Sequence, residues 1–217
     1  MFYARVDHVS VPLAQEGTGQ VVVDFTPEPL TQDVSFVFHI EKTADVVVDS
    51  LTAEISGIPS TMELTTGLIL AQKTYKLLFR PTYAALPSAA DSASAETLRC
   101  EASVNIPGIV RSHTEDMVTG PGILQIAIYT HYDYEEEGTQ RKAAKVFHAG
   151  INLYHTLKER KSLQWDEEEN GYRQASRSIT VEIGSPLNID KDGILNGGST
   201  STGLDQWIPG ETFEIEV

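Results

Sequence analysis

The chain has 217 residues, of which 31 are acidic and 16 are basic, so its formal net charge at pH 7 is −15. This charge repels phosphate backbones and anionic lipid headgroups, so nucleic acid and bare membrane surfaces are not expected partners. Hydrophobic residues make up 41% and charged residues 22% of the chain, which is ordinary globular usage and excludes disorder of the whole.

Residues 1–12, MFYARVDHVSVP, are expected to form a lead-in strand or an interdomain linker. This stretch lacks the charged start and the long apolar core of a signal peptide, and no run in the chain approaches the eighteen or so apolar residues of a membrane-spanning helix. If the protein is exported, its signal therefore lies outside this sequence. Residues 13–217 are expected to form a single domain.

Alternation of apolar and polar residues is the dominant pattern of the chain and is typical of half-buried strands. It predicts roughly eight to ten strands, each with one apolar face. The clearest apolar faces, in chain order, are Val34, Phe36, Phe38 and Ile40; Leu51, Ala53 and Ile55; Tyr75, Leu77 and Phe79; Leu98, Cys100, Ala102, Val104 and Ile106; Leu124, Ile126 and Ile128; Ile179, Val181 and Ile183; and Phe213, Ile215 and Val217.

Turn signals such as SGIPS, TGPG and EEEGTQ separate these runs at the spacing of a sandwich rather than of alternating strands and helices. The SGIPS stretch is interpreted as a strand end that enters a turn at Gly57 and Pro59. Helical periodicity is almost confined to INLYHTLKERKSLQW, where Leu153, Leu157 and Ile151 share one side. The pattern predicts an all-β Greek-key β-sandwich with long loops and little helix.

Two long stretches are expected to be loops. Residues 84–96 are rich in Ala and Ser, and residues 158–177 are irregular and contain an acidic run. Neither has the apolar content to pack as a unit of its own.

Cys100 is the only cysteine, so an intrachain disulfide and four-thiolate metal sites are excluded. It falls on the apolar face of its predicted strand. We therefore expect a buried structural thiol rather than a nucleophile.

The stretch NIDKDGILNGGS begins as a calcium loop does, with Asn188, Asp190 and Asp192 at alternating positions before Gly193. The twelfth position of such a loop, which needs a bidentate Glu, is Ser199. An Asx-rich turn is therefore the preferred interpretation, and calcium binding by these three residues stays open.

Other catalytic patterns are weak. The six histidines show no i, i+4 pair of the kind that binds zinc on a helix, no Gly-x-Ser-x-Gly motif occurs, and no Lys follows the Gly-rich residues 197–203. We assign no catalytic, cofactor-binding or metal-ligating residue and expect a protein that is not an enzyme. Trp165, Trp207 and Tyr132 are candidates for an aromatic platform that stacks on sugar rings.

The chain resembles the fimbrillin-like proteins of Bacteroidales, particularly a fimbrial-anchor branch described as a domain of unknown function. The resemblance lies in MFYARVDHVSVP, in FVFHIEK and in LTAEISGIPSTMELTTG, and it covers residues 2–80 best. Within the last stretch, the residues that match the family's strand, break and strand pattern are Ile55, Ser56, Gly57, Met62, Leu64 and Gly67.

The resemblance implies a transthyretin-like β-sandwich and a surface lipoprotein of the outer membrane that anchors, terminates or decorates a fimbria. Other fimbrial subunits would then be the partners, joined by strand addition, and the C-terminal TFEIEV is a natural place for sheet completion within the chain or across to a neighbour. The chain departs from the family in lacking the lipid-bearing N-terminal cysteine, so that membrane attachment would need an anchor absent from this sequence, and in having room for one sandwich only. The alternative functions are an outer-surface glycan-binding module and, third, a secreted hydrolase.

Overall fold

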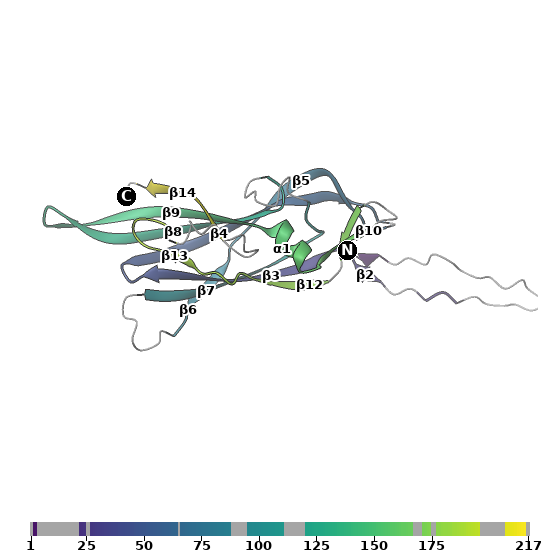
Figure 1. The fold of residues 1–217 in the computed structure, drawn as a ribbon, viewed down its shortest axis with the longest axis horizontal. Helices are drawn as coiled ribbons and strands as arrows, with labels where there is room; N and C mark the ends of the chain where they lie inside the picture. Colours follow the sequence, from purple (N-terminus) through teal and green to yellow (C-terminus); the bar gives the residue numbers. More distant parts are fainter. Residues whose placement is uncertain are drawn as a thin grey trace, which may run out of the picture.

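The computed structural model describes residues 2–3, 22–24, 27–64, 66–87, 95–110, 120–166, 171–174, 177–195 and 207–215. Most of these residues lie in strands, and two five-stranded sheets face each other as two layers (Figure 1). The predicted all-β sandwich is therefore confirmed. The only helix in the described ranges is α1 (Leu153–Glu159), and none of the described helical segments is long and apolar enough to cross a membrane.

One layer, called here the β3 sheet, is built around its longest central strand. Its strand order is β12 (Ser178–Glu182), β3 (Gln32–Thr43), β7 (Ala95–Ile106) and β6 (Thr82–Ala85), and β13 (Leu187–Ile189) also pairs with β3. The strands β12 and β13 run parallel to β3, whereas β7 is antiparallel to both β3 and β6.

The other layer, called here the β8 sheet, is antiparallel throughout. Its strand order is β14 (Ile208–Ile215), β9 (Thr139–Asn152), β8 (Ile123–Glu136), β4 (Val46–Met62) and β5 (Ile69–Phe79). Two short pairs complete the described structure: β1 (Phe2–Tyr3) with β2 (Glu28–Pro29), and β10 (Leu163–Asp166) with β11 (Gly171–Gln174).

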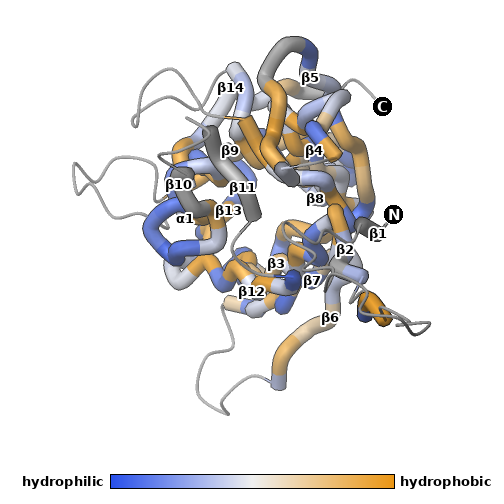
Figure 2. The backbone as a smooth tube through the Cα atoms, turned by 90° about the vertical axis from the view of Figure 1, so that its right-hand side faces the viewer, coloured by the Kyte–Doolittle hydropathy of each residue, from blue (hydrophilic) through white to orange (hydrophobic). Residues whose placement is uncertain are grey.

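The core lies between the two sheets and follows the predicted alternation (Figure 2). Every second residue of β3, from Val34 to Ile40, is at most 1% exposed, and the same holds for the predicted face of β8. The predicted faces of β4, β7 and β12 also lie in or against this core. The predicted helix is confirmed as well, because Leu153 and Leu157 are fully buried on its inner side.

The inward faces end in buried cations. Lys42 continues the apolar face of β3 and is 7% exposed, and its Nζ pairs with a carboxylate oxygen of Glu96 at 2.7 Å. On the opposite sheet, Lys145 is 8% exposed and its Nζ donates to the carbonyl oxygen of Lys191 at 2.7 Å. Both long side chains thus bring a charged group to a polar partner at the margin of the core.

The SGIPS stretch does not end its strand, so this prediction is wrong. Strand β4 continues to Met62, and its register against β5 shifts between Ile55 and Ile58. Gly57 has φ +78°, a conformation that favours glycine, and it forms the bulge at this point. Two carbonyl groups at the bulge bond outside the β4–β5 pair: that of Ser56 accepts from Gly122 N–H, and that of Gly57 accepts from Val110 N–H.

Two predicted apolar faces differ from the structure. Tyr75 is predicted inside the sandwich but is 45% exposed. It pairs with the core residue Ile58 and so keeps the predicted alternation, but β5 is the outer strand of its sheet, where the inward side chains Leu77 and Phe79 are also only partly buried. Phe213 was expected on a buried face but is 51% exposed. Phe213 pairs with Val146 in β9. Because Val146 is next to the core residue Phe147, its side chain and that of Phe213 lie on the outer face of the sheet. The side chain of Ile215 and all of Val217 lie outside the described residues.

The two expected loops are only partly irregular. Residues 158–177 include the β10–β11 hairpin, which the sequence analysis did not predict. In the stretch 84–96, strand β6 continues to Ala85 and β7 begins at Ala95, while residues 88–94 lie outside the described ranges. Of the lead-in 1–12, only Phe2 and Tyr3 are described.

Candidate functional site

The proposed aromatic platform does not form at Trp207. This residue is 5% exposed, and its ring meets that of Phe38 edge-on with the centroids 5.4 Å apart. Its indole Nε1 is buried and has no hydrogen-bond partner among the described residues. Trp207 is thus a core residue that joins the start of β14 to β3.

The other two platform residues lie on separate elements. Tyr132 is half-buried near the margin of the core, where Lys145 Nζ lies 5.5 Å from its ring centroid and Tyr134 lies 6.3 Å away, centroid to centroid. Trp165 lies in β10 opposite Tyr172, and its side chain is outside the described structure. The structure therefore does not assemble the three residues into one surface.

The stretch that resembles a calcium loop forms a tight turn after β13. Asp190 Oδ1 accepts from the backbone N–H groups of Asp192 at 2.7 Å and Gly193 at 2.8 Å, which confirms the predicted Asx turn. The carbonyl oxygen of Asn188 accepts from Leu195 N–H at 2.8 Å. In the part of the chain that is described, no group of three His, Cys, Asp or Glu side chains is arranged to hold a metal ion.

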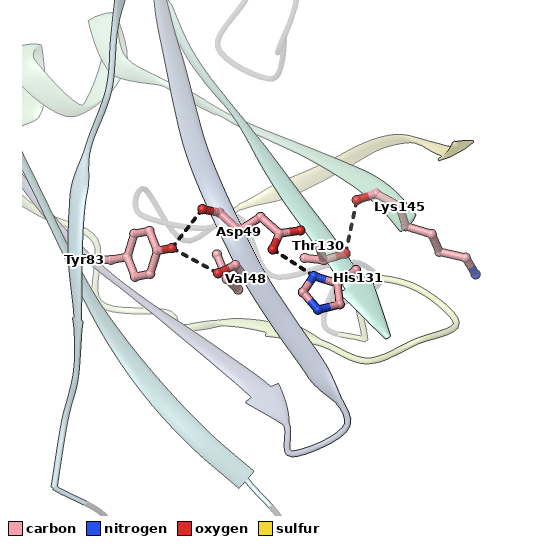
Figure 3. Close-up of polar contacts among 6 residues, drawn as sticks. All are labelled: Val48, Asp49, Tyr83, Thr130, His131 and Lys145. Atoms are coloured by element: carbon pink, nitrogen blue, oxygen red, sulfur yellow. Dashed lines mark hydrogen bonds and ion pairs between the residues drawn. The ribbon is translucent and has the colours of Figure 1, made fainter. Parts of the chain in front are cut away.

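Two of the described histidines, His131 and His148, contact separate neighbours. His131 Nδ1 lies 2.8 Å from Asp49 Oδ1, and the ring of His148 meets that of Phe213 edge-on at 5.6 Å between centroids (Figure 3 shows the first pair). Asp49 lies in a second bulge of β4, where the register against β8 shifts between Val48 and Ser50. His8 and His113 lie outside the described residues.

The same bulge joins the two sheets. The hydroxyl of Tyr83, in β6, lies 3.0 Å from the carbonyl oxygen of Val48 and 3.1 Å from that of Asp49 (Figure 3). A bulge interrupts the hydrogen bonds between neighbouring strands and leaves backbone carbonyl groups without N–H partners. The Tyr83 hydroxyl supplies a donor to these carbonyl oxygens. This contact stabilises the edge of the β3 sheet against the opposite layer.

Cys100 is fully buried, as predicted, on the inner face of β7. Burial raises the pKa of its thiol from 9.0 to about 12, because the thiolate would lose its hydration. The thiol therefore stays protonated at neutral pH, which is the behaviour of a structural cysteine.

Three outer strands of the two large sheets are protected as edges usually are. Arg160 donates from its two terminal nitrogens to the carbonyl oxygens of Thr180 and Glu182, at 3.1 and 2.8 Å, and so covers the free side of β12. Strand β6 has only four residues, and Pro81 and Pro87 lie beside its ends. Strand β5 carries two lysines, and its register with β4 shifts twice.

Strand β14 is also an outer strand, with Pro209 and a bulge near its start and a regular stretch at its end. Within the described ranges it pairs with β9 alone, and residues 212–215 pair regularly after a bulge near Pro209. Its apolar side chains Ile208 and Phe213 are 42% and 51% exposed on the outer face of the β8 sheet. The C-terminal strand therefore completes a sheet within its own chain, and its other side pairs with no strand of the described residues.

A groove that the sequence analysis missed lies on the outer face of the β8 sheet, over the Gly57 bulge. We call it the β4–β5 groove; it has a volume of about 430 Å³. Its lining comprises Glu54, Ser56, Gly57, Thr74, Tyr75, Lys76, Gly120, Pro121 and Gln125. The sequence did carry one signal for it, because an isolated glycine inside a strand pattern often marks a bulge.

Comparison of the chain with protein-family models, with curated proteins and with solved structures finds no match.

Proposed function

We propose that the protein is a non-enzymatic structural or adhesion component of the cell surface, either a fimbrial subunit or a fimbrial anchor or accessory component. In this proposal it is exported to the outer membrane surface and joins other fimbrial subunits by strand addition. Any membrane attachment runs through an N-terminal lipid anchor outside this sequence. The Greek-key, transthyretin-like topology that the resemblance implies is part of the same proposal.

The observation that carries the proposal is the open edge of β14. Strand addition uses the unpaired backbone N–H and C=O groups of an edge strand for affinity, and alternate side chains for specificity. Arg160 occupies the carbonyl oxygens on the free side of β12, which protects that edge from an added strand. Strand β14 instead carries the exposed side chain of Phe213, which an added strand could cover.

The side chains of β14 suit an incoming strand on its free side. Phe213 and Ile208 lie on the outer face, whereas Thr212 lies opposite the core residue Phe147. An added strand would pair with β14 as a sixth strand and cover the exposed ring of Phe213. The burial of an aromatic side chain would add to the backbone hydrogen bonds.

The experiment is immunogold electron microscopy of cells that produce the protein, with an antibody against the purified chain. Gold on surface filaments supports the proposal. A protein confined to the cytosol contradicts it.

The role of β14 is tested in the same cells with Phe213→Lys, which places a charge on the open edge. We expect this variant to reach the surface but to be lost from filaments. Leu78→Lys is the matched control, because Leu78 is an exposed apolar residue on β5, the other edge strand of the same sheet. Equal incorporation of both variants would rule out the β14 edge as the contact.

A further inference from the structure

Asp192 and Gly193 form the only Asp–Gly pair of the sequence, and they lie in the turn that follows β13. An Asp–Gly peptide bond can rearrange, because glycine has no side chain that hinders an attack by its backbone nitrogen on the preceding carboxyl group. Asp192 is exposed and Gly193 is half-buried, so solvent has access to the pair. The turn therefore contains a candidate site of spontaneous covalent modification.

The rearrangement needs only water, which it releases and then takes up again. The Gly193 nitrogen gives its proton to solvent and bonds to Cγ of Asp192, while the carboxyl group loses one oxygen as water, so that a succinimide ring forms. Water then adds to one of the ring carbonyl carbons. Addition at Cγ restores aspartate. Addition at the main-chain carbon breaks its bond to the Gly193 nitrogen, which takes up a proton, and the chain then runs through Cβ and Cγ as isoaspartate.

Asp190 holds the attacking nitrogen in its protonated form. Its Oδ1 accepts from Gly193 N–H at 2.8 Å and from Asp192 N–H at 2.7 Å. A hydrogen bond from an amide to a carboxylate is stronger than one between neutral groups, and it favours the amide that keeps its proton. The nitrogen of Gly193 must lose this bond before it can attack.

The backbone of the turn is also fixed on both sides of Asp192. Asp190 N–H donates to the carbonyl oxygen of Gly193 at 3.0 Å. Lys145 Nζ, from the opposite sheet, donates to the carbonyl oxygen of Lys191 at 2.7 Å. Ring closure requires rotation of the backbone at Asp192, and isoaspartate adds a carbon atom to that backbone. Either change disturbs the bonds that close the turn.

We propose that Asp190 protects the Asp192–Gly193 bond against rearrangement, and that Asp192 becomes a site of isoaspartate formation when the hydrogen bond to Gly193 N–H is lost. Asp190 is a positioning residue, because it acts on the Gly193 nitrogen and takes no part in the bond changes. The Asp-x-Asp-Gly spacing, which resembles the start of a calcium loop, then has a role that requires no metal. The inference concerns only this turn and does not depend on the proposed function.

The experiment follows isoaspartate at residue 192 while the full chain is stored in warm, neutral buffer. After digestion, the aspartyl and isoaspartyl peptides are separated by reversed-phase chromatography and distinguished by electron-transfer fragmentation. We expect Asp190→Ala to form isoaspartate about fivefold faster than the native protein, or more, which is the factor that corresponds to the loss of one hydrogen bond. Asp190→Asn keeps an acceptor oxygen and should stay close to the native rate.

Gly193→Ala identifies the attacking atom. Nothing lies within 4 Å of a Cβ atom on Gly193, so the added methyl group fits the fold but hinders the attack. Combined with Asp190→Ala, it should return the rate to the native value or below. The Asn170–Gly171 pair, elsewhere in the sequence, is the internal reference, and its rate should be equal in all variants.

Amide hydrogen exchange of Gly193 is a second readout that does not involve the covalent step, and thermal melting of each variant shows that it is folded. We expect slow exchange in the native protein and faster exchange in Asp190→Ala. Equal isoaspartate rates in the native protein and in Asp190→Ala would overturn the inference. Fast exchange of Gly193 in the native protein, or a double variant that reacts as fast as Asp190→Ala, would also overturn it.

Discussion

A Cβ atom on Gly57 would lie 2.4 Å from the backbone nitrogen of Gly122. The bulge in β4 and the turn before β8 are therefore packed backbone against backbone. The N–H of Gly122 donates to the carbonyl oxygen of Ser56 at 3.0 Å across this contact. A side chain at position 57 would separate these two segments.

The first prediction follows from this contact. Gly57→Ala should lower the free energy of unfolding by about 3 kcal/mol, because it combines a left-handed backbone with a clash that only backbone movement relieves. Gly138→Ala is the control: Gly138 has the same φ of +78°, but nothing lies within 4 Å of its added Cβ. This control should lose about 1 kcal/mol. Urea denaturation of the two variants measures the difference, and equal losses would show that the contact with Gly122 is unimportant.

The hydroxyl of Tyr83 is the second target. Tyr83→Phe keeps the ring but removes the donor to the carbonyl oxygens of Val48 and Asp49. We expect a loss of about 1 kcal/mol in the free energy of unfolding. Tyr134→Phe, for which the structure gives a ring contact with Tyr132 but no such bond, should be neutral. A neutral Tyr83→Phe would mean that water replaces the hydroxyl at the bulge.

Arg160 is expected to protect an edge rather than to stabilise the fold. Because its guanidinium is exposed, Arg160→Gln should cost less than about 1 kcal/mol in unfolding free energy. It should instead speed amide hydrogen exchange in β12 and increase aggregation, since the carbonyl oxygens of Thr180 and Glu182 lose their donors. Lys161→Gln, one residue further along, is the control for the loss of one positive charge. If both variants aggregate equally, net charge and not edge protection is responsible.

The inner faces of the sandwich could be predicted because alternation is a local property. Every second residue from Val34 to Ile40 and from Leu124 to Ile128 lies on one face of its strand, whichever strands pair with it. The same alternation places Cys100 on a buried face. The helix at Leu153 and Leu157 follows from spacing in the same way.

What could not be predicted depends on contacts between distant parts of the chain. Alternation says that Phe213 and Thr212 face opposite ways but not which of them faces the core, which is decided by the register of β14 against β9. The bulge at Gly57 packs against the backbone of Gly122, which lies 65 positions later in the chain. The β4–β5 groove was missed for the same reason, since it draws residues from three strands.

The raised pKa of Cys100 predicts a decline of stability in alkali. Below pH 9 the thiol is protonated in both the folded and the unfolded chain, and its contribution is fully present. Between pH 9 and about pH 12 the unfolded chain releases the proton while the folded chain keeps it, because burial raises the pKa of Cys100 to about 12. The free energy of unfolding therefore falls as pH rises through this window.

Cys100→Ala should remove this part of the decline. Tyrosines and lysines titrate in the same range in both proteins, so the readout is the difference between their urea-derived stabilities from pH 8 to pH 11. We expect that difference to shift toward the variant as the pH rises. In the native protein the thiol should also resist a disulfide reagent at pH 8 until urea unfolds the chain. Rapid native-state labelling would contradict the burial of Cys100.

The last prediction concerns Asp190, whose carboxylate is already bonded to the backbone of its own turn. Since Asp190 Oδ1 accepts from Asp192 N–H and Gly193 N–H, a thermal melt with a calcium chelator should have the same midpoint as one with added calcium. Asp190→Asn keeps an acceptor oxygen and should melt close to the native protein, whereas Asp190→Ala should lose about 1 kcal/mol under both conditions. A midpoint that rises with calcium in the native protein, and not in Asp190→Ala, would instead show that Asn188, Asp190 and Asp192 bind the metal, with the Asx turn as the unliganded form of the loop.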